Sequence, residues 1–356
     1  MNKYYFSNIK RPFLIAEISS NHCGSINTAK KLISMAKKYD ADAIKFQTFS
    51  PETMTINSTK KDFKIQTGLW KGYNLWELYS KAQTPLEWHK ELFEYSKKKG
   101  IVCFSSAFDE TSVDFLEKLN TPFYKVASFE MTDIPLIKKI ARTKKPMIIS
   151  TGLANLDEIK LAYDTANKNG CKEIILLYCV SSYPASEKDI NLNNIKKLKK
   201  VFNCKVGFSD HTNDLNIASA AIAAGAEFIE KHIALENQKK GFDIKFSIKG
   251  KDLLNLRKNI DKTYLYLGNK NFVRTKNELK NKKFRRSIYV VKNIKKGEAF
   301  SKINIKCIRP GYSVDPKYFE KIIGKKSPSN LNFGSRINPK ILKKIQHSYS
   351  SRGINL

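Results

Sequence analysis

Two histidines stand at the ends of neighbouring predicted strands, and their type and spacing suit a divalent metal ion. His211 follows the apolar run in "KVGFSDHT" at 205–212, and His232 lies near the end of "FIEKHIAL" at 228–235. Neighbouring strands of one sheet bring their ends together, so both imidazoles could reach one ion. A single histidine in such a place is more often a hydrogen-bonded core residue, and the pair is what favours a metal. Two protein ligands would leave positions open for water and substrate, as Lewis-acid catalysis requires.

Two lysines and a set of serines at other strand ends suit an anionic substrate. Lys45 and Lys125 each lie in an otherwise apolar run, and a buried lysine is costly without a partner of opposite charge. We therefore expect an anion beside them. The hydroxyls that together resemble a phosphate or carboxylate cradle belong to Ser106, Ser128, Ser150, Ser181 and Ser209. Glu17 and Glu130 could carry protons or orient a sugar hydroxyl.

The chain has five histidines, and the other three are less readily assigned. His22, in "SSNHCG", either binds substrate or orders the first loop. His89 lies in the amphipathic segment "TPLEWHKELF" and is interpreted as structural, and His347, in the tail, is assigned no role. Asp210 and Thr212 flank the first histidine of the pair, and their position favours orientation of its imidazole.

Eight short apolar runs, each followed by an amphipathic segment, would position these side chains. Each run is almost continuously apolar at its start, as expected for parallel strands that are covered on both faces. The predicted strands are 13–19, 43–49, 101–108, 123–128, 146–151, 173–180, 205–210 and 228–235. The predicted helices are 27–40, 84–99, 110–120, 133–143, 155–169, 192–202, 216–225 and 251–267. Eight strand–helix units are typical of a (β/α)8 TIM barrel, an α/β fold whose chemistry occurs where the strands end.

One insertion and one C-terminal unit depart from this alternation. The segment 50–83 is long and aromatic, and loops of this length in a compact domain are usually functional. In a barrel it would lie at the C-terminal face, over the active site. After a barrel at 1–268 we expect a lysine-rich linker at 269–283, a small, mostly β domain at 284–345 and a frayed tail at 346–356.

The formal net charge is +32, with 65 Lys and Arg against 33 Asp and Glu, which invites comparison with nucleic-acid-binding proteins. The lysines are spread over nearly every predicted helix, so we expect no nucleic-acid partner. No apolar run approaches the roughly 18 residues of a membrane span, and the polar N-terminus lacks a signal-peptide core. The six cysteines include no CxxC pair. We therefore expect a soluble cytoplasmic protein with free thiols and no membrane contact.

The strand-end motifs resemble those of the nonulosonic (sialic) acid synthase family, in the order expected along the barrel. They are "IAEISSNHCGS", "AIKFQTF", "YKVASFE", "IISTGLA", "GFSDHT" and "IEKHIAL". The C-terminal unit, with "RRSIYVVKNIKKGEAF" and "IRPG", resembles the antifreeze-like (SAF) domain of these enzymes. The resemblance extends from residue 12 to residue 340. It implies condensation of phosphoenolpyruvate with the open-chain aldehyde of an N-acetylated amino sugar, which gives a nine-carbon 2-keto acid and phosphate.

The resemblance also implies roles for individual residues. His211 and His232 would bind Mn2+, with Mg2+ or Co2+ as alternatives, and would act in catalysis with Glu17 and Glu130. Phosphoenolpyruvate would be bound by Lys45, Ser106, Lys125, Ser128, Ser150, Ser181 and Ser209. The residues that would hold the sugar are Gln47, Tyr183, Asp243 and Arg309. The last of these would reach the barrel of a neighbouring subunit, which implies a domain-swapped homodimer.

Within the family, the insertion is more similar to that of pseudaminic acid synthases than to that of N-acetylneuraminate synthases. The turn "SSYP" places Ser181 where sialic acid synthases carry Asn, which supports the same branch. Two further departures bear on the sugar: "ASFE" replaces "SGE" near Ser128, and "KKGFDIKFS" lacks the Pro usual before the aspartate matching Asp243. The expected sugar is 2,4-diacetamido-2,4,6-trideoxy-L-altrose.

Two alternatives stay open. The same chemistry on another sugar would give N-acetylneuraminate or legionaminate. A basic binding protein with an inactive barrel would instead use the +32 charge, and it would bind nucleic acid in a salt-sensitive way without releasing phosphate. Glu17, His211 and His232 argue against this second alternative.

Overall fold

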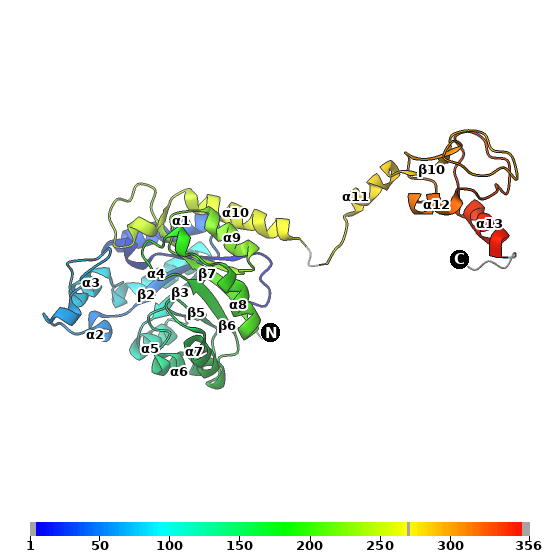
Figure 1. Cartoon of the computed structure of the whole chain (residues 1–356). Helices are drawn as coiled ribbons and strands as arrows, with labels where there is room; N and C mark the ends of the chain where they lie inside the picture. Colours follow the sequence, from blue (N-terminus) through cyan, green and yellow to red (C-terminus); the bar gives the residue numbers. More distant parts are fainter. Residues whose placement is uncertain (1–4, 269–270, 351–356) are drawn as a thin grey trace. The chain divides into compact units, whose positions relative to one another are not determined.

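The computed structural model describes residues 5–268 and 271–350, and the chain divides after Gly268 into two compact units (Figure 1). Each unit has a hydrophobic core of its own. Residues 351–356 and the side chain of His347, both from the predicted tail, lie outside the described residues. Among the described helices, none is long and apolar enough to cross a membrane.

The first unit is a closed barrel of eight parallel strands, which confirms the predicted fold. Each strand pairs in parallel with the next, and β8 pairs with β1 to close the barrel. The strands are β1 (Phe13–Glu17), β2 (Ala43–Thr48), β3 (Val102–Ala107), β4 (Tyr124–Val126), β5 (Met147–Ser150), β6 (Ile174–Cys179), β7 (Lys205–Asp210) and β8 (Phe228–Ala234). A short strand, β9 (Ile248–Lys249), pairs with the end of β8.

Helices follow the strands and surround the barrel (Figure 1). They are α1 (Ile26–Lys38), α4 (Leu86–Lys99), α5 (Glu110–Lys118), α6 (Ile134–Arg142), α7 (Leu156–Lys168), α8 (Asn193–Phe202), α9 (Asn216–Ala223) and α10 (Asp252–Leu267). Helix α7 begins at an N-cap residue, because the Asn155 side chain accepts hydrogen bonds from two backbone N–H groups of the first turn. The α4 helix begins two residues later than predicted, because the Thr84 hydroxyl lies 3.3 Å from His22 Nε2 and does not cap the helix.

The interior of the barrel is apolar toward the N-terminal ends of the strands. Phe6, from the segment before β1, joins this interior cluster, which also contains Phe123, just before β4, and the strand residues Ile15, Ala43, Phe104, Ile148, Ile175, Leu177 and Phe228. Gly207 must be glycine here, because a Cβ would lie 2.5 Å from the Cβ and the carbonyl oxygen of Phe228. The cluster therefore closes one end of the barrel.

The same inward faces become polar toward the C-terminal ends of the strands. Side chains alternate along a strand, so the residue two positions after an interior apolar residue also faces inward. These later inward positions are Glu17, Lys45, Ser106, Lys125, Ser150, Cys179, Ser209 and Glu230. The same alternation of side chains therefore places apolar residues in the core and polar residues in the layer above it, which we call the floor.

Short helices occupy several of the βα loops at this end of the barrel. They include η1 (Ser19–His22), η3 (Glu187–Asp189) and η4 (Ile244–Phe246). The insertion at 50–83 forms α2 (Pro51–Met54), η2 (Lys61–Phe63) and α3 (Leu75–Ala82). Residues from this insertion line the same cavity as the strand ends, so it lies over the predicted face of the barrel.

The second unit is small and rich in turns. Its elements are α11 (Lys276–Leu279), η5 (Lys280–Phe284), β10 (Ser287–Val290), β11 (Ile305–Ile308), η6 (Pro316–Tyr318), α12 (Phe319–Ile322) and α13 (Pro339–Ser350). The strands β10 and β11 are antiparallel, and isolated bridges such as Ile294 with Leu331 extend this β structure. Buried Ile288, Phe300 and Ile337 belong to its core.

Candidate functional site

A cavity of about 410 Å³ opens where the strands end. Its floor is formed by polar residues from the strand ends, and aromatic and aliphatic residues form its walls. The polar lining comprises Ser19, Ser20, Lys45, Gln47, Tyr79, Lys125, Ser128, Glu130, Ser150, Tyr183, Ser209, His211, Glu230, His232 and Asp243. The apolar lining includes Phe49, Met54, Ile65, Trp70, Leu75, Leu78, Phe108, Phe129, Phe242 and Phe246. A ligand with a charged end and an apolar body would match both parts.

Two lysines and two glutamates form a buried charge quartet at the floor. Lys45 Nζ lies 2.7 Å from Glu17 Oε2 and 3.5 Å from Glu230 Oε1, and it donates a hydrogen bond to Ser106. Lys125 Nζ lies 3.7 Å from Glu230 Oε1, beyond hydrogen-bond distance. The anion expected beside the lysines is therefore at least partly supplied by the protein. Formally, two positive charges face two negative charges, but burial raises the pKa of Glu17 to about 7, so its carboxyl is partly protonated near pH 7.

The two lysines differ in how well they are compensated. Burial lowers the pKa of Lys45, but Glu17 and Glu230 more than offset this effect, so its pKa is raised. Burial outweighs the attraction of Glu230 at Lys125, whose pKa is lowered. Lys125 is therefore the cation that would gain more from an added anion.

The hydroxyls on the floor converge because one loop residue has no side chain. A Cβ on Gly152 would lie 2.0 Å from Ser181 Oγ and 2.8 Å from Ser128 Oγ. Instead, the Gly152 N–H donates a hydrogen bond of 3.2 Å to Ser128 Oγ. On the other side of the floor, Ser209 donates a hydrogen bond of 3.1 Å to Glu230. Ser128, Ser150 and Ser209 thus line the cavity with both lysines, and Ser106 accepts a hydrogen bond from Lys45. Ser181 lies beside Gly152 and does not line the cavity.

Several buried polar atoms of the cavity lining have no hydrogen-bond partner among the residues that the structure describes. They include Ser150 Oγ, Glu130 Oε2, Glu230 Oε2 and His232 Nδ1, and all four residues line the cavity. A buried polar atom left unpaired costs free energy unless water or a ligand satisfies it. Their concentration in one cavity indicates a site built for a polar ligand.

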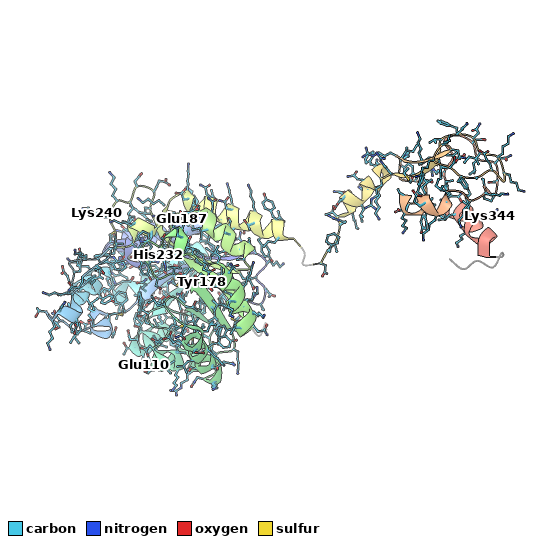
Figure 2. The ribbon with its side chains drawn as sticks, viewed as in Figure 1. Glu110, Tyr178, Glu187, His232, Lys240 and Lys344 are labelled. Atoms are coloured by element: carbon cyan, nitrogen blue, oxygen red, sulfur yellow. The ribbon has the colours of Figure 1, made fainter. Side chains whose placement is uncertain are left out.

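The two histidines lie together above the floor, with ring centroids 5.5 Å apart. Figure 2 labels His232 within the barrel unit. His211 Nδ1 lies 3.2 Å from the carbonyl oxygen of Val180. A hydrogen bond donated there leaves Nε2 free as a lone-pair donor. Burial lowers the pKa of His211 to about 4 and that of His232 well below its usual value. Both imidazoles are therefore neutral near pH 7, the form that binds metal ions.

The histidine pair fits a metal ion that takes only part of its ligands from the protein. The described residues contain no cluster of three or more His, Cys, Asp or Glu side chains arranged to hold an ion. His232 Nδ1 is an unpaired buried donor atom, and Asp243 Oδ2 lies 3.7 Å from it. Any ion here would have to complete its coordination with water or substrate.

The remaining predicted residues fall into three groups. Gln47, Tyr183 and Asp243 line the cavity, and the ring centroids of Tyr183 and His211 are 4.6 Å apart. Glu17 is fully buried next to Lys45 and does not line the cavity. Arg309 is exposed in the second unit, so the described barrel does not contain it.

His22 and His89 are both buried outside the cavity lining. His22 Nδ1 accepts a hydrogen bond of 3.2 Å from the Gly24 N–H, and its ring packs edge-on against Trp88. This favours the ordering of the first loop over substrate binding. His89 lies 2.8 Å from Thr48 Oγ1, in agreement with its structural interpretation.

Glu230 lies on β8, and no role was predicted for it from the sequence. The structure shows it between both lysines and Ser209. Its position two residues before His232 on one strand was the available signal, because residues two apart face the same side. No such signal predicted the aromatic walls formed by Phe49, Phe129 and Phe246, since the conformation of a loop does not follow from the alternation of side chains along a strand.

Comparison with known proteins supports both units. The NeuB family model matches residues 32–272, and the SAF domain model matches residues 285–340. The chain is 40% identical over 332 residues to the pseudaminic acid synthase of Campylobacter jejuni subsp. jejuni serotype O:23/36 (strain 81-176), covering 93% of this chain and 97% of that protein. It is 38% identical over 326 residues to the N,N'-diacetyllegionaminic acid synthase of C. jejuni subsp. jejuni serotype O:2, covering 90% and 97%. A solved structure of an N-acetylneuraminic acid (sialic acid) synthetase from Leptospira borgpetersenii matches with a TM-score of 0.69 at 31% identity, covering 76% of this chain and 90% of that chain.

The carboxyl of Glu130 should make stability depend on pH. Burial raises its pKa from 4.5 to about 7. Below pH 4.5 the folded and unfolded states both hold the proton, and above pH 7 the folded state must bury a carboxylate. The resulting loss of stability grows as the pH rises through this window. We predict that Glu130→Gln raises the free energy of unfolding at pH 8 by at most about 3 kcal/mol and leaves it unchanged at pH 4.

Urea unfolding at both pH values measures this difference. Glu52→Gln, which changes an exposed glutamate, is the control and should match the original protein at both values. An equal effect of Glu130→Gln at pH 4 and pH 8 would contradict the raised pKa.

Proposed function

The chain belongs to the NeuB family, and from this premise we propose that it is a pseudaminic acid synthase. It would condense phosphoenolpyruvate with 2,4-diacetamido-2,4,6-trideoxy-L-altrose and water to give a nine-carbon nonulosonic acid and phosphate. The observation that carries the proposal is the floor of the cavity, where Lys45, Lys125 and unpaired polar atoms lie beside two neutral histidines. Its relatives are named as synthases, which favours an enzyme over an inactive binding barrel.

Phosphoenolpyruvate would bind on the floor through its two anionic groups. Lys125 offers an incompletely compensated positive charge, and Ser150 Oγ is an unpaired hydroxyl. Ser106, Ser128, Ser181 and Ser209 add further donors around the lysines. Charge-assisted hydrogen bonds of this kind are roughly twice as strong as neutral ones. The phosphate or carboxylate would accept a hydrogen bond from Ser150 Oγ, whereas the unpaired oxygens of Glu130 and Glu230 are acceptors and would need a donor such as water or a sugar hydroxyl.

The sugar would lie between this floor and the apolar walls. Gln47, Tyr183 and Asp243 are placed to bind its hydroxyl and amide groups. Phe49, Phe129 and the insertion's Trp70 and Leu78 present apolar surface, which suits the 6-methyl carbon and the acetamido methyl groups of a 6-deoxy sugar. The legionaminic alternative uses the same chemistry, and its 38% identical relative keeps it as the second candidate.

The reaction forms one carbon–carbon bond and breaks one carbon–oxygen bond. Electrons of the phosphoenolpyruvate double bond join its C3 to the aldehyde carbon, and the aldehyde oxygen takes a proton. Water forms a new bond to C2 and loses one proton. The C2–O bond to phosphate then breaks, the hydroxyl that came from water loses its second proton to become the keto oxygen, and phosphate leaves. Glu130, with a pKa of about 7, is partly protonated at neutral pH and can give that first proton. Holding both reactants on one floor can supply up to about 7–11 kcal/mol.

We also propose that His211 and His232 hold a divalent ion, Mn2+ with Mg2+ or Co2+ as alternatives. The neutral imidazoles and the unpaired His232 Nδ1 support this proposal. When bound, such an ion would polarise the sugar aldehyde as a Lewis acid. The Mn2+ titration in the next subsection tests it.

The proposal also includes a homodimeric assembly and a cytoplasmic location. Arg309, in the second unit, would contact the sugar's acetamido group from a second subunit in a domain-swapped homodimer, as the resemblance of "IRPG" to the family's SAF domain implies. A cytoplasmic location is proposed on the free thiols, several of them buried, such as Cys103 and Cys179.

The choice of sugar is the first test of the proposed function. We predict that kcat/KM for 2,4-diacetamido-2,4,6-trideoxy-L-altrose exceeds that for N-acetylmannosamine at least about tenfold, since the apolar walls match its methyl groups. Phosphate release with mass spectrometry of the product measures both. Faster use of N-acetylmannosamine would contradict the proposed sugar, and the absence of phosphate release with a panel of candidate sugars would contradict the reaction.

Substitution of Arg309 tests the shared site. Arg309→Ala should raise KM for the sugar by about 10–100-fold, because a charged hydrogen bond is lost, and should leave thermal unfolding unchanged. Arg336→Ala changes another exposed arginine of the same unit and is the matched control. Sedimentation velocity reports the assembly state. Full activity of a monomer, or an unchanged KM in Arg309→Ala, would contradict the swapped site.

A further inference from the structure

A second buried ion pair lies directly behind the histidines, on the outward faces of the same two strands. Asp210 and Lys231 are partners in the register of β7 and β8, and both side chains are fully buried. Lys231 Nζ donates a hydrogen bond of 2.9 Å to Asp210 Oδ2. Along the chain, Asp210 immediately precedes His211 and Lys231 immediately precedes His232. The pair therefore joins the two strands at the point where each presents its imidazole.

The pair also closes a ring around the backbone of His211. Asp210 Oδ1 accepts hydrogen bonds from the N–H of Thr212 at 2.8 Å and from its hydroxyl at 2.7 Å. Lys231 Nζ donates a second hydrogen bond to the carbonyl oxygen of Thr212. The residues on both sides of His211 are thus tied to one ammonium group on the neighbouring strand.

We propose that Lys231 is a positioning residue that sets the separation of His211 and His232 for a shared metal ion. Asp210 and Thr212 act with it, and we call Lys231, Asp210 and Thr212 together the clamp. The inference rests on the metal site of the proposed function and adds to it the part of the protein that fixes the two ligands.

The energetics favour a geometric role over a stabilising one. Desolvation of a buried ion pair can cancel its electrostatic attraction, and apolar residues of similar size often serve stability as well. What an apolar pair cannot supply is the set of directed hydrogen bonds that fixes both strand ends at once. Groups that orient metal ligands typically change metal affinity about 10–100-fold when they are removed.

A control for a general loss of stability is available at the other end of the barrel. Arg257 is also a buried cation, and its Nη1 donates hydrogen bonds of 2.9 Å to Asp42 and to the carbonyl oxygen of Pro12. It also pairs with Asp261. It therefore joins carboxylate and carbonyl groups as Lys231 does, but near the starts of β1 and β2. Arg257→Met should destabilise the barrel without changing the histidine pair.

The experiment is a Mn2+ titration of the full-length chain, followed by electron paramagnetic resonance of the free ion, with thermal unfolding of each variant. Lys231→Met should weaken Mn2+ binding about 10–100-fold and lower the unfolding temperature by roughly 10 °C. The double variant Asp210→Asn/Lys231→Met removes both charges, so it should regain much of the unfolding temperature while Mn2+ binding stays weak. Arg257→Met should bind Mn2+ as the original protein does, and phosphoenolpyruvate affinity without metal should be unchanged in both Lys231 variants.

The outcomes separate the clamp from the metal site. His232→Ala should abolish Mn2+ binding, and failure of the original protein to bind Mn2+, or full binding by His232→Ala, would overturn the metal site and the clamp with it. If His232→Ala loses Mn2+ but Lys231→Met or the double variant binds it normally, only the clamp is overturned. Equal weakening in Arg257→Met would show general damage and would also overturn the clamp.

Discussion

The balance of two buried lysines against two buried glutamates is the constraint on which this structure depends. Burial of a single ammonium or carboxylate is costly, so Lys45 and Lys125 require Glu17 and Glu230 close by. The balance is uneven, because Lys125 has its carboxylate at 3.7 Å and a lowered pKa. The folded protein can therefore accommodate these buried charges, and the floor still attracts an anion. The incomplete compensation of Lys125 thus favours anion binding at a cost in folding free energy.

The barrel provides this floor by simple alternation. Phe228, Glu230 and His232 occupy successive inward positions on β8, which run from the apolar core through the charge quartet to the histidine pair. The outward residue Lys231 lies between them in sequence and ties β8 to β7. One strand therefore contributes to the core, to the anion site, to the histidine pair and to the contact behind it.

Much of this organisation could be predicted from the sequence, because each strand shows it locally. The apolar starts and polar ends of the eight runs predict the barrel, its reactive face and residues such as His211 and Ser150. Relations between strands could not be read in the same way. An isolated strand does not reveal that Glu230 reaches both lysines, and the anion predicted beside them was assigned to substrate although carboxylates of the protein already lie there. The position of Arg309 relative to the cavity depends on how units assemble, which no local pattern encodes.

The most direct test of the central claim is the binding of phosphoenolpyruvate, without sugar, to the original protein and to Lys125→Met. Isothermal titration calorimetry gives both dissociation constants, and Lys139→Met, which changes a lysine paired with Asp114 on the surface, is the control. Loss of one partner of a buried charge pair should weaken binding at least about 30-fold in Lys125→Met, with the control unchanged. Equal affinity in all three proteins would contradict the role of the charge quartet as the anion site.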